Sequence, residues 1–186
     1  MTLEALRKQF IDFLEEAHRL KKLYASELAI LVGLETEFVT PLDLQQLEHL
    51  LEAESERIEY VVGSVHHVNE IAIDFDRPTY EKAVDSLSKQ GDIQSDTLAR
   101  YLCAYFNAQY ELLERFQPEV VGHFDLCRLY TPELRFQDFP DAWRLLERNV
   151  QYAISYGALF EINAAAFRKG WSTAYPGEDV TQVSVQ

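Results

Sequence analysis

Histidine and glutamate side chains occur at or just beyond the ends of short apolar runs in this sequence. Glu35 follows one such run, His66 follows a second, and His123 closes a third. Carboxylate and imidazole groups are common ligands of divalent cations, and ligands from separate strands can converge on one ion. In parallel α/β folds, functional side chains gather where the strands end. The distribution of these three residues therefore points to a metal site.

Each of these residues also has an ordinary explanation when it is taken alone. A single histidine at a strand end is more often a hydrogen-bonded structural residue than a ligand, and Glu35 can be a loop acid. The joint occurrence at successive run ends is harder to explain in this way, so both interpretations stay open. The other two histidines outside these ends, His18 and His49, have charged neighbours and are predicted on the surface.

The elements that must position these residues follow from hydrophobic periodicity and capping signals. Helices are predicted at residues 3–23, from Pro41, from Pro78, from Ser95 to about Phe116, and at residues 140–156. Strands are predicted at residues 28–33, 59–65, 119–123 and 158–163, and loop or tail at 173–186. The alternation of strands with helices predicts parallel βαβ units in one domain, either as an open sheet or as an incomplete barrel.

The acidic balance of the chain limits its partners. Its 17 Lys and Arg against 31 Asp and Glu give a formal net charge of -14. A field of that sign repels nucleic acid and anionic membranes, so we expect neither as a partner. The sequence has no apolar run long enough to cross a bilayer, and its first residues are not expected to act as a secretory signal. With Cys103 and Cys127 expected to be reduced, these features predict a cytoplasmic protein.

Four segments at these positions resemble one known family. They are GLE at 33–35, GSVHHVNEIAIDFD at 63–76, VVGHFDLCRL at 120–129, and LFEINAAAFRKG at 159–170. In this order they resemble the histidinol-phosphate phosphatases of the PHP (polymerase and histidinol phosphatase) family, especially the fungal type. The GSVH run followed by IDFD is fairly specific to that branch, whereas a GxE or a GH alone would be a weak signal.

The resemblance implies a distorted (β/α)7 barrel with parallel strands and flanking helices. In this chain it would be an incomplete PHP barrel domain at residues 1–177, followed by a tail at 178–186. The family binds up to three divalent metal ions, and mixed imidazole and carboxylate ligands suit zinc, manganese or iron. By position, the implied metal ligands are Glu35, His66 and His123.

The resemblance also assigns residues around the metal site. Arg168 lies where the family places a basic residue near the substrate phosphate, and Arg128 is a second phosphate candidate with a surface salt bridge as its alternative. Asp125 is expected to orient its neighbours. His67 is a weaker ligand candidate than the histidine before it, because adjacent strand residues point to opposite faces.

The implied activity is metal-dependent hydrolysis of histidinol phosphate to histidinol and phosphate, a step of histidine biosynthesis. Asp74 and Asp76 either face the ammonium and imidazole of that substrate or serve as a loop acid and a helix cap. The family also has an HxH motif at its first strand and an Asp-x-His pair on a late strand, and this sequence contains neither. We therefore expect a form truncated at both ends, with fewer metal ions and weak or no activity.

Two alternatives to this function remain at the level of sequence. One is another PHP phosphoesterase, such as a nuclease, which the acidic charge argues against. The other is a non-catalytic interaction protein built on a degraded barrel. The sequence leaves the oligomeric state open.

Overall fold

A four-stranded parallel sheet organises the chain in the computed structural model, which describes residues 2–184. The strands are β1 (Gly33–Glu35), β2 (Tyr60–Gly63), β5 (Val120–Val121) and β6 (Leu159–Phe160), and they lie side by side in that order. Each neighbouring pair is parallel, as the alternation of strands and helices predicts. Within the described chain β1 and β6 are the two edges, so the sheet is open and not a closed barrel.

The register of the sheet brings the carboxyl ends of its strands to one rim. Glu35 lies opposite Val62, and Gly63 lies opposite Val121. Val121 in turn lies opposite Phe160. Residues that follow these positions therefore leave the sheet at a common rim, as expected for parallel strands joined by helical crossovers.

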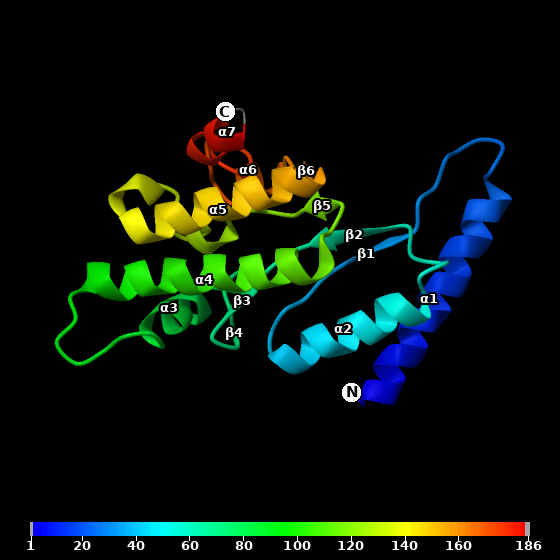
Figure 1. Cartoon of the computed structure of the whole chain (residues 1–186), viewed down its shortest axis with the longest axis horizontal. Helices are drawn as coiled ribbons and strands as arrows, with labels where there is room; N and C mark the ends of the chain where they lie inside the picture. Colours follow the sequence, from blue (N-terminus) through cyan, green and yellow to red (C-terminus); the bar gives the residue numbers. More distant parts are fainter. Residues whose placement is uncertain (1, 185–186) are drawn as a thin grey trace.

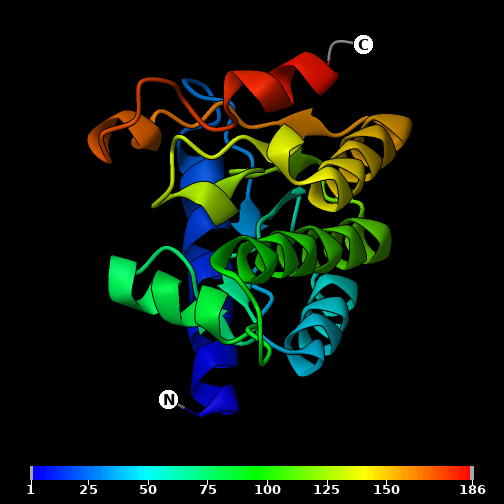
Figure 2. The same ribbon diagram turned by 90° about the vertical axis from the view of Figure 1, so that its left-hand side faces the viewer.

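Helices connect the strands and pack around the sheet (Figures 1 and 2). They are α1 (Leu3–Leu23), α2 (Pro41–Ala53), α3 (Arg77–Asp85), α4 (Gln94–Phe116), α5 (Pro140–Tyr156), α6 (Ala165–Arg168) and α7 (Glu178–Ser184), with short 3-10 turns η1 (Leu126–Arg128) and η2 (Phe136–Asp138). A small antiparallel hairpin, β3 (His67–Val68) and β4 (Ile71–Ala72), follows β2. In both views α4 and α5 lie side by side, and α1 lies at one end of the long axis in Figure 1. In residues 2–184, no helix combines the length and apolar character that a membrane span requires.

Short polar side chains fix where several helices begin. The Thr2 hydroxyl accepts a hydrogen bond from the backbone N–H of Ala5, 3.2 Å away, at the start of α1. Asp76 accepts one from the N–H of Thr79 at 2.7 Å and so caps α3. These contacts satisfy N–H groups that have no partner inside the helix. The sequence left two roles open for Asp76, and the structure shows that it is the helix cap.

The main hydrophobic core lies where α4 and α5 pack together. Tyr101, Tyr105 and Phe106 of α4 are fully buried. The Phe106 ring centre lies 6.1 Å from that of Phe124 and 5.4 Å from that of Phe136. Burial of one such ring contributes roughly 2 to 3 kcal/mol. Because Phe124 follows one of the predicted ligands directly, the core anchors the backbone of the predicted site.

Two expectations about the elements are wrong. The strand expected at residues 28–33 begins only at its last residue, since β1 covers Gly33–Glu35. Leu28 and Leu31 are apolar but 59% and 65% exposed, so apolar character there does not reflect a buried strand. The stretch expected as loop or tail at 173–186 contains the helix α7, and its last two residues, 185–186, lie outside the described residues. That helix packs against α5 and buries Val180 completely.

Candidate metal centre

The structure brings Glu35, His66 and His123 together at the carboxyl rim of the sheet. Glu35 ends β1, while His66 and His123 come shortly after β2 and β5, the next two strands in the sheet. Each of the three offers one ligand atom, and these atoms all lie within 4.8 Å of one another. The parallel register explains this convergence, because adjacent strands deliver their following residues to the same place.

The contacts inside this cluster join atoms that carry lone pairs. His123 Nε2 lies 2.9 Å from Glu35 Oε1 and 3.0 Å from His66 Nε2. His66 Nε2 lies 3.5 Å from the same glutamate oxygen. Two imidazole nitrogens and a carboxylate oxygen that aim at one point suit a cation placed between them. The donor set thus fits a divalent metal ion, with the three-ligand arrangement that leaves room for water or substrate.

A second carboxylate contacts the far side of each imidazole. Glu37 Oε2 lies 3.1 Å from His66 Nδ1, and Glu161 Oε2 lies 2.9 Å from His123 Nδ1. An ionised carboxylate can only accept a hydrogen bond, so when Nε2 binds a metal ion the single proton of each ring would be on Nδ1. Asn163 Nδ2 also approaches His123 Nδ1, but at the longer distance of 3.3 Å. The Nε2 lone pairs are then free for a metal ion.

Hydrogen bonds made by Thr36 hold the two segments that follow β1 and β2 in register. The Thr36 hydroxyl accepts from the backbone N–H of Ser64 at 2.9 Å and donates to its carbonyl at 3.2 Å. The backbone N–H of Thr36 donates to Val62 at 2.8 Å. Thr36 and Ser64 are both 2% exposed, so water does not compete for these bonds. The spacing between the glutamate and the first histidine of the cluster is thereby fixed.

The segment after β5 is held in an unusual conformation. His123 has a φ of 27°, in the left-handed region that few non-glycine residues adopt. The carbonyl of Phe124 accepts hydrogen bonds from Gln109 Nε2 at 3.0 Å and from the Tyr105 hydroxyl at 3.2 Å. A Cβ at Gly122 would lie 2.5 Å from Ser64 Oγ, so this position requires glycine. The glycine before the histidine thus allows close strand contact and is more than a turn signal.

The electrostatics of the cluster favour positive charge at its centre. A hydrogen bond from His123, outweighing the effect of burial, lowers the pKa of Glu35 to about 2. Burial by itself would lower the pKa of His66, but Glu37 outweighs it and raises that pKa above its ordinary value. Burial is likewise outweighed at His123, whose pKa Glu35 and Glu161 raise. The surrounding carboxylates therefore stabilise either a proton or a metal ion at this point.

Arg128 lies in a buried ion-pair network and not on the surface. Its guanidinium donates to Asp125 at 2.7 Å, to Asp179 at 2.6 Å and to the carbonyl of Leu134 at 3.0 Å. Asp125 is 0% exposed and also accepts from the backbone N–H of Gly177. Asp125 thus orients Arg128 and the segment before α7, and it lies outside the metal cluster.

Two further residues from the sequence lie outside the cluster of three ligand atoms. Arg168 ends α6, is exposed, and within residues 2–184 makes no hydrogen bond or ion pair. The helix begins near His123, because the Asn163 side chain approaches His123 Nδ1 at 3.3 Å and also accepts from the N–H of Ala165 at 2.8 Å. His67 is outside the ligand cluster, and its Nδ1 lies 2.9 Å from Glu37 Oε1.

The sequence by itself assigns no role to Glu37 or Glu161. A signal for each exists. Glu37 lies two residues beyond Glu35, which places both side chains on one face of an extended segment. Glu161 directly follows β6, the neighbour of the strand that precedes His123. Neither signal shows which histidine nitrogen the carboxylate reaches.

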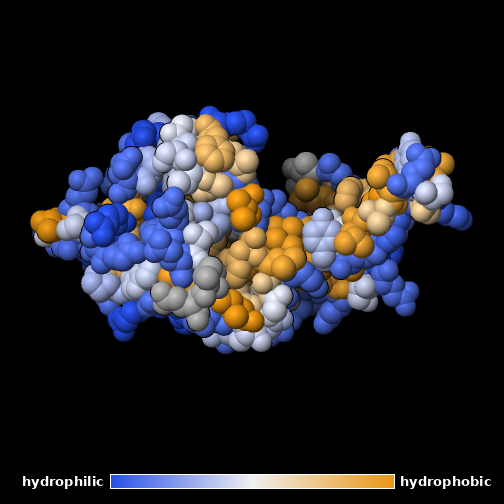
Figure 3. Space-filling view, turned by 90° about the horizontal axis from the view of Figure 1, so that it is seen from above, coloured by the Kyte–Doolittle hydropathy of each residue, from blue (hydrophilic) through white to orange (hydrophobic). Residues whose placement is uncertain are grey.

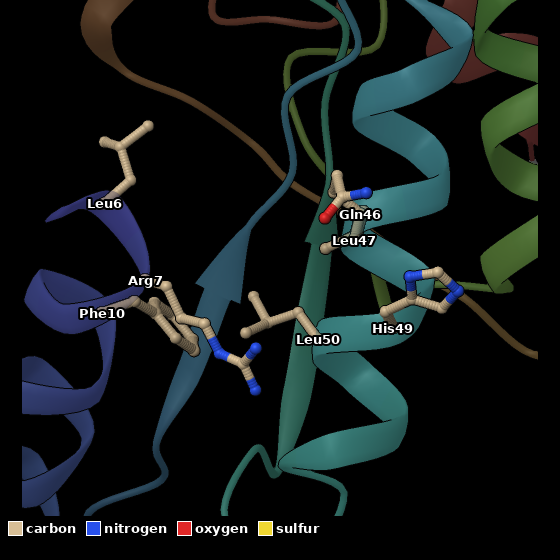
Figure 4. Close-up of a pocket in the computed structure, with 7 residues that line it drawn as sticks. All are labelled: Leu6, Arg7, Phe10, Gln46, Leu47, His49 and Leu50. Atoms are coloured by element: carbon tan, nitrogen blue, oxygen red, sulfur yellow. The ribbon is translucent and has the colours of Figure 1, made fainter. Parts of the chain in front are cut away.

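A separate groove lies between α1 and α2 (Figure 4). Its volume is about 320 Å³, and it is lined mainly by apolar side chains, including Leu6, Phe10, Leu47 and Leu50. Figure 3 shows that apolar surface also gathers on the upper face of the molecule. The groove shares no lining residue with the cluster and lacks its carboxylates, so the chemistry belongs to the sheet rim.

Comparison with known proteins identifies the class of protein that the fold and the site define. The PHP domain family matches residues 2–165, and the chain belongs to this family. It is 40% identical to a probable histidinol-phosphatase of Schizosaccharomyces pombe, over 98% of this chain and 58% of that protein. It is 30% identical to a histidinol-phosphatase of Saccharomyces cerevisiae, over 93% of this chain and 57% of that protein. The chain thus spans less than three fifths of the length of these curated relatives.

Proposed function

We propose that this protein is a histidinol-phosphate phosphatase, a metal-dependent enzyme that hydrolyses a small phosphomonoester. One observation carries the proposal: Glu35, His66 and His123 present their ligand atoms within 4.8 Å of one another, at the rim where α/β folds hold their active sites. Membership of the PHP family and the names of the two yeast relatives support the substrate class.

The residues of the cluster would hold one divalent ion, with zinc, manganese or iron as the candidates. When bound, such an ion supplies charge that polarises a phosphoryl oxygen and lowers the pKa of a water molecule. The described residues 2–184 offer one three-ligand group of this kind. Because the resemblance implies a larger cluster, we expect the 186-residue chain by itself to turn over weakly.

Three charged residues are proposed as candidates for binding the two ends of the substrate. Arg168 is an exposed cation whose side chain has no hydrogen-bond or ion-pair partner among residues 2–184; it lies in the segment that follows β6 and would contact the phosphate. Arg128 is the weaker candidate, because two carboxylates already occupy its guanidinium. Asp74 contributes negative charge that His66 experiences, so it would face the ammonium of histidinol phosphate.

A cytoplasmic location is part of the proposal. Cys103 and Cys127 are both free thiols in the structure. Burial raises the pKa of Cys127, which keeps that thiol protonated and unreactive. Free, unreactive thiols are typical of proteins that work in a reducing compartment.

The test is phosphate release from histidinol phosphate by the purified chain after loading with manganese or zinc. We expect slow release that His123→Gln abolishes and that His49→Gln leaves unchanged, since His49 is exposed on α2. Faster hydrolysis of a phosphodiester such as bis-p-nitrophenyl phosphate would favour another PHP phosphoesterase. Less than one equivalent of bound metal per chain after loading would favour a non-catalytic interaction protein and refute the proposal.

A further inference from the structure

We propose that Glu37 and Glu161 are positioning residues of the metal centre: each carboxylate holds the Nδ1–H of one metal-binding histidine and so turns its Nε2 toward the ion. The inference rests on the metal centre of the proposed function. It assigns a role to two glutamates that lie outside the cluster of three ligand atoms.

Glu161 accepts two hydrogen bonds from a single residue, His123. Its Oε2 accepts from the backbone N–H of His123 at 3.0 Å and from the ring Nδ1 at 2.9 Å. The glutamate comes from the end of β6, and the histidine follows the adjacent strand β5. Backbone and ring are therefore fixed together, which also stabilises the left-handed φ of 27° at this histidine.

The two carboxylate oxygens of Glu37 contact two neighbouring histidines, one each. Oε2 lies 3.1 Å from His66 Nδ1, and Oε1 lies 2.9 Å from His67 Nδ1. The successive histidines thus have different roles. His66 presents Nε2 to the ion, whereas His67 holds the carboxylate that orients His66. His67 therefore belongs to the site although it lies outside the cluster of ligand atoms.

Orientation of the rings affects metal affinity for a physical reason. A histidine whose Nδ1–H is bound to a carboxylate keeps the tautomer and the ring angle that metal binding requires, and its Nε2 becomes a stronger base. Loss of such a partner typically costs about 10- to 100-fold in metal affinity. Both rings of the cluster have this support, each from a different carboxylate and a different segment of the chain.

The measurement is the affinity for zinc by calorimetric titration, with the visible spectrum of the cobalt-loaded protein as a second readout. We expect Glu161→Ala to weaken zinc binding about 10- to 100-fold. Glu161→Gln should lose less, because its amide oxygen can still accept from His123. Glu37→Gln keeps one acceptor oxygen for two histidines, so we expect it to weaken binding as well. The matched control is Glu81→Gln on α3, whose side chain is 61% exposed.

The possible outcomes separate this inference from the proposed function. Wild-type affinity and unchanged cobalt bands in both Glu161 variants and in Glu37→Gln would overturn it while the metal centre stands. A wild-type chain that binds no zinc would overturn the metal centre itself. Thermal unfolding in EDTA checks that each variant is folded, and if Glu161→Ala is not, the two glutamine variants decide. His67→Phe should weaken binding less than His66→Phe, and equal losses would contradict the separate roles.

Discussion

At the scale of single residues, the site depends on close approach between β2 and β5. At Gly122 this approach leaves little room for a side chain, since an added Cβ would lie 2.5 Å from Ser64 Oγ and 3.0 Å from Val62 Cγ1. These neighbours are short side chains on or next to β2, so they have little freedom to move. The glycine therefore sets the distance between the two strands that carry the histidines.

We expect Gly122→Ala to lower the free energy of unfolding by about 1–3 kcal/mol, the usual cost of overpacking. It should also weaken metal binding, because the strands must separate next to His123. Urea unfolding and zinc titration measure the two effects. Gly91→Ala is the control: it has a φ of 90° and nothing within 4 Å of its added Cβ, so it should strain the turn without changing metal affinity. Equal metal affinity in both variants would contradict the prediction.

The raised pKa values of His66 and His123 predict how the metal-free protein responds to pH. A histidine whose pKa is higher in the folded state stabilises the fold when protonated. That contribution is fully present below the unfolded value of about 6.5 and is lost as the pH rises through the folded value. The thermal midpoint in EDTA should thus fall as the pH rises from about 6 upward.

The double variant His66→Gln, His123→Gln serves as the control and should show a smaller slope in the same window. A midpoint that stays level or rises for the wild-type chain would contradict the predicted sign. With metal present the dependence on pH should reverse, because the ion requires unprotonated Nε2 atoms.

The three proposed ligands could be predicted from sequence because each lies at or just after the end of a short strand, and parallel topology brings strand ends together. The supporting glutamates could not. Their role depends on which ring nitrogen each oxygen reaches, and that follows from side-chain directions that only the folded chain defines. Arg128 shows the same limit, since the ion pair was predictable but its burial was not.

At the scale of elements, α7 is tied to the body of the protein by charge. Arg128 of η1 pairs with Asp179 of α7 and with Asp125, and its guanidinium lies 4.5 Å from the centre of the Phe136 ring. The arginine side chain is only 5% exposed. Removal of a partner therefore leaves a buried charge without its full compensation.

Asp125→Ala should destabilise the protein by about 3–5 kcal/mol, the range for breaking a buried ion pair. Asp179→Ala should cost less, about 1–3 kcal/mol, because Asp179 is 22% exposed and Asp125 still pairs with the arginine. Chemical denaturation measures both. Asp141→Ala removes an exposed ion pair with Arg144 and should change stability by under about 1 kcal/mol. The prediction fails if all three substitutions have the same effect.

Helices were easier to predict than strands, for a physical reason. Pro140 to Tyr156 has helical spacing and clear ends, and the predicted range matches α5 at both ends. Strands of two to four residues carry too few positions for a period to be read. The exposed leucines before β1 made the predicted strand begin too early. The charged residues of α7 obscured its helical pattern, and the buried residue of that helix is Val180.

At the scale of the whole molecule, the accessible surface of 10917 Å² is larger than expected. A compact protein of 21.6 kDa exposes about 9,200 Å². The excess agrees with the open sheet and with the position of α1 at one end of the long axis (Figure 1). The parallel order of the strands was predictable from sequence, but the choice between an open sheet and a barrel required the structure.

Amide hydrogen exchange should reflect this uneven distribution of packing. We expect the slowest exchange in α4, which buries Tyr101, Tyr105 and Phe106 against α5 and the sheet. Exchange should be fastest in α1, where Leu14 is the buried residue among the described side chains. Local openings are cheapest where few apolar contacts break. Equal protection of the two helices by mass spectrometry would contradict this picture.

The parallel order of the sheet also separates two sides of the molecule. The proposed ligands leave the strands at one rim, while the connection from α2 to β2, residues 54–59, enters at the other. Ser55 and Glu56 are exposed there. A fluorophore or a surface tether attached at either residue would point away from the metal centre. Immobilised or labelled protein would then keep its reacting face open to solution.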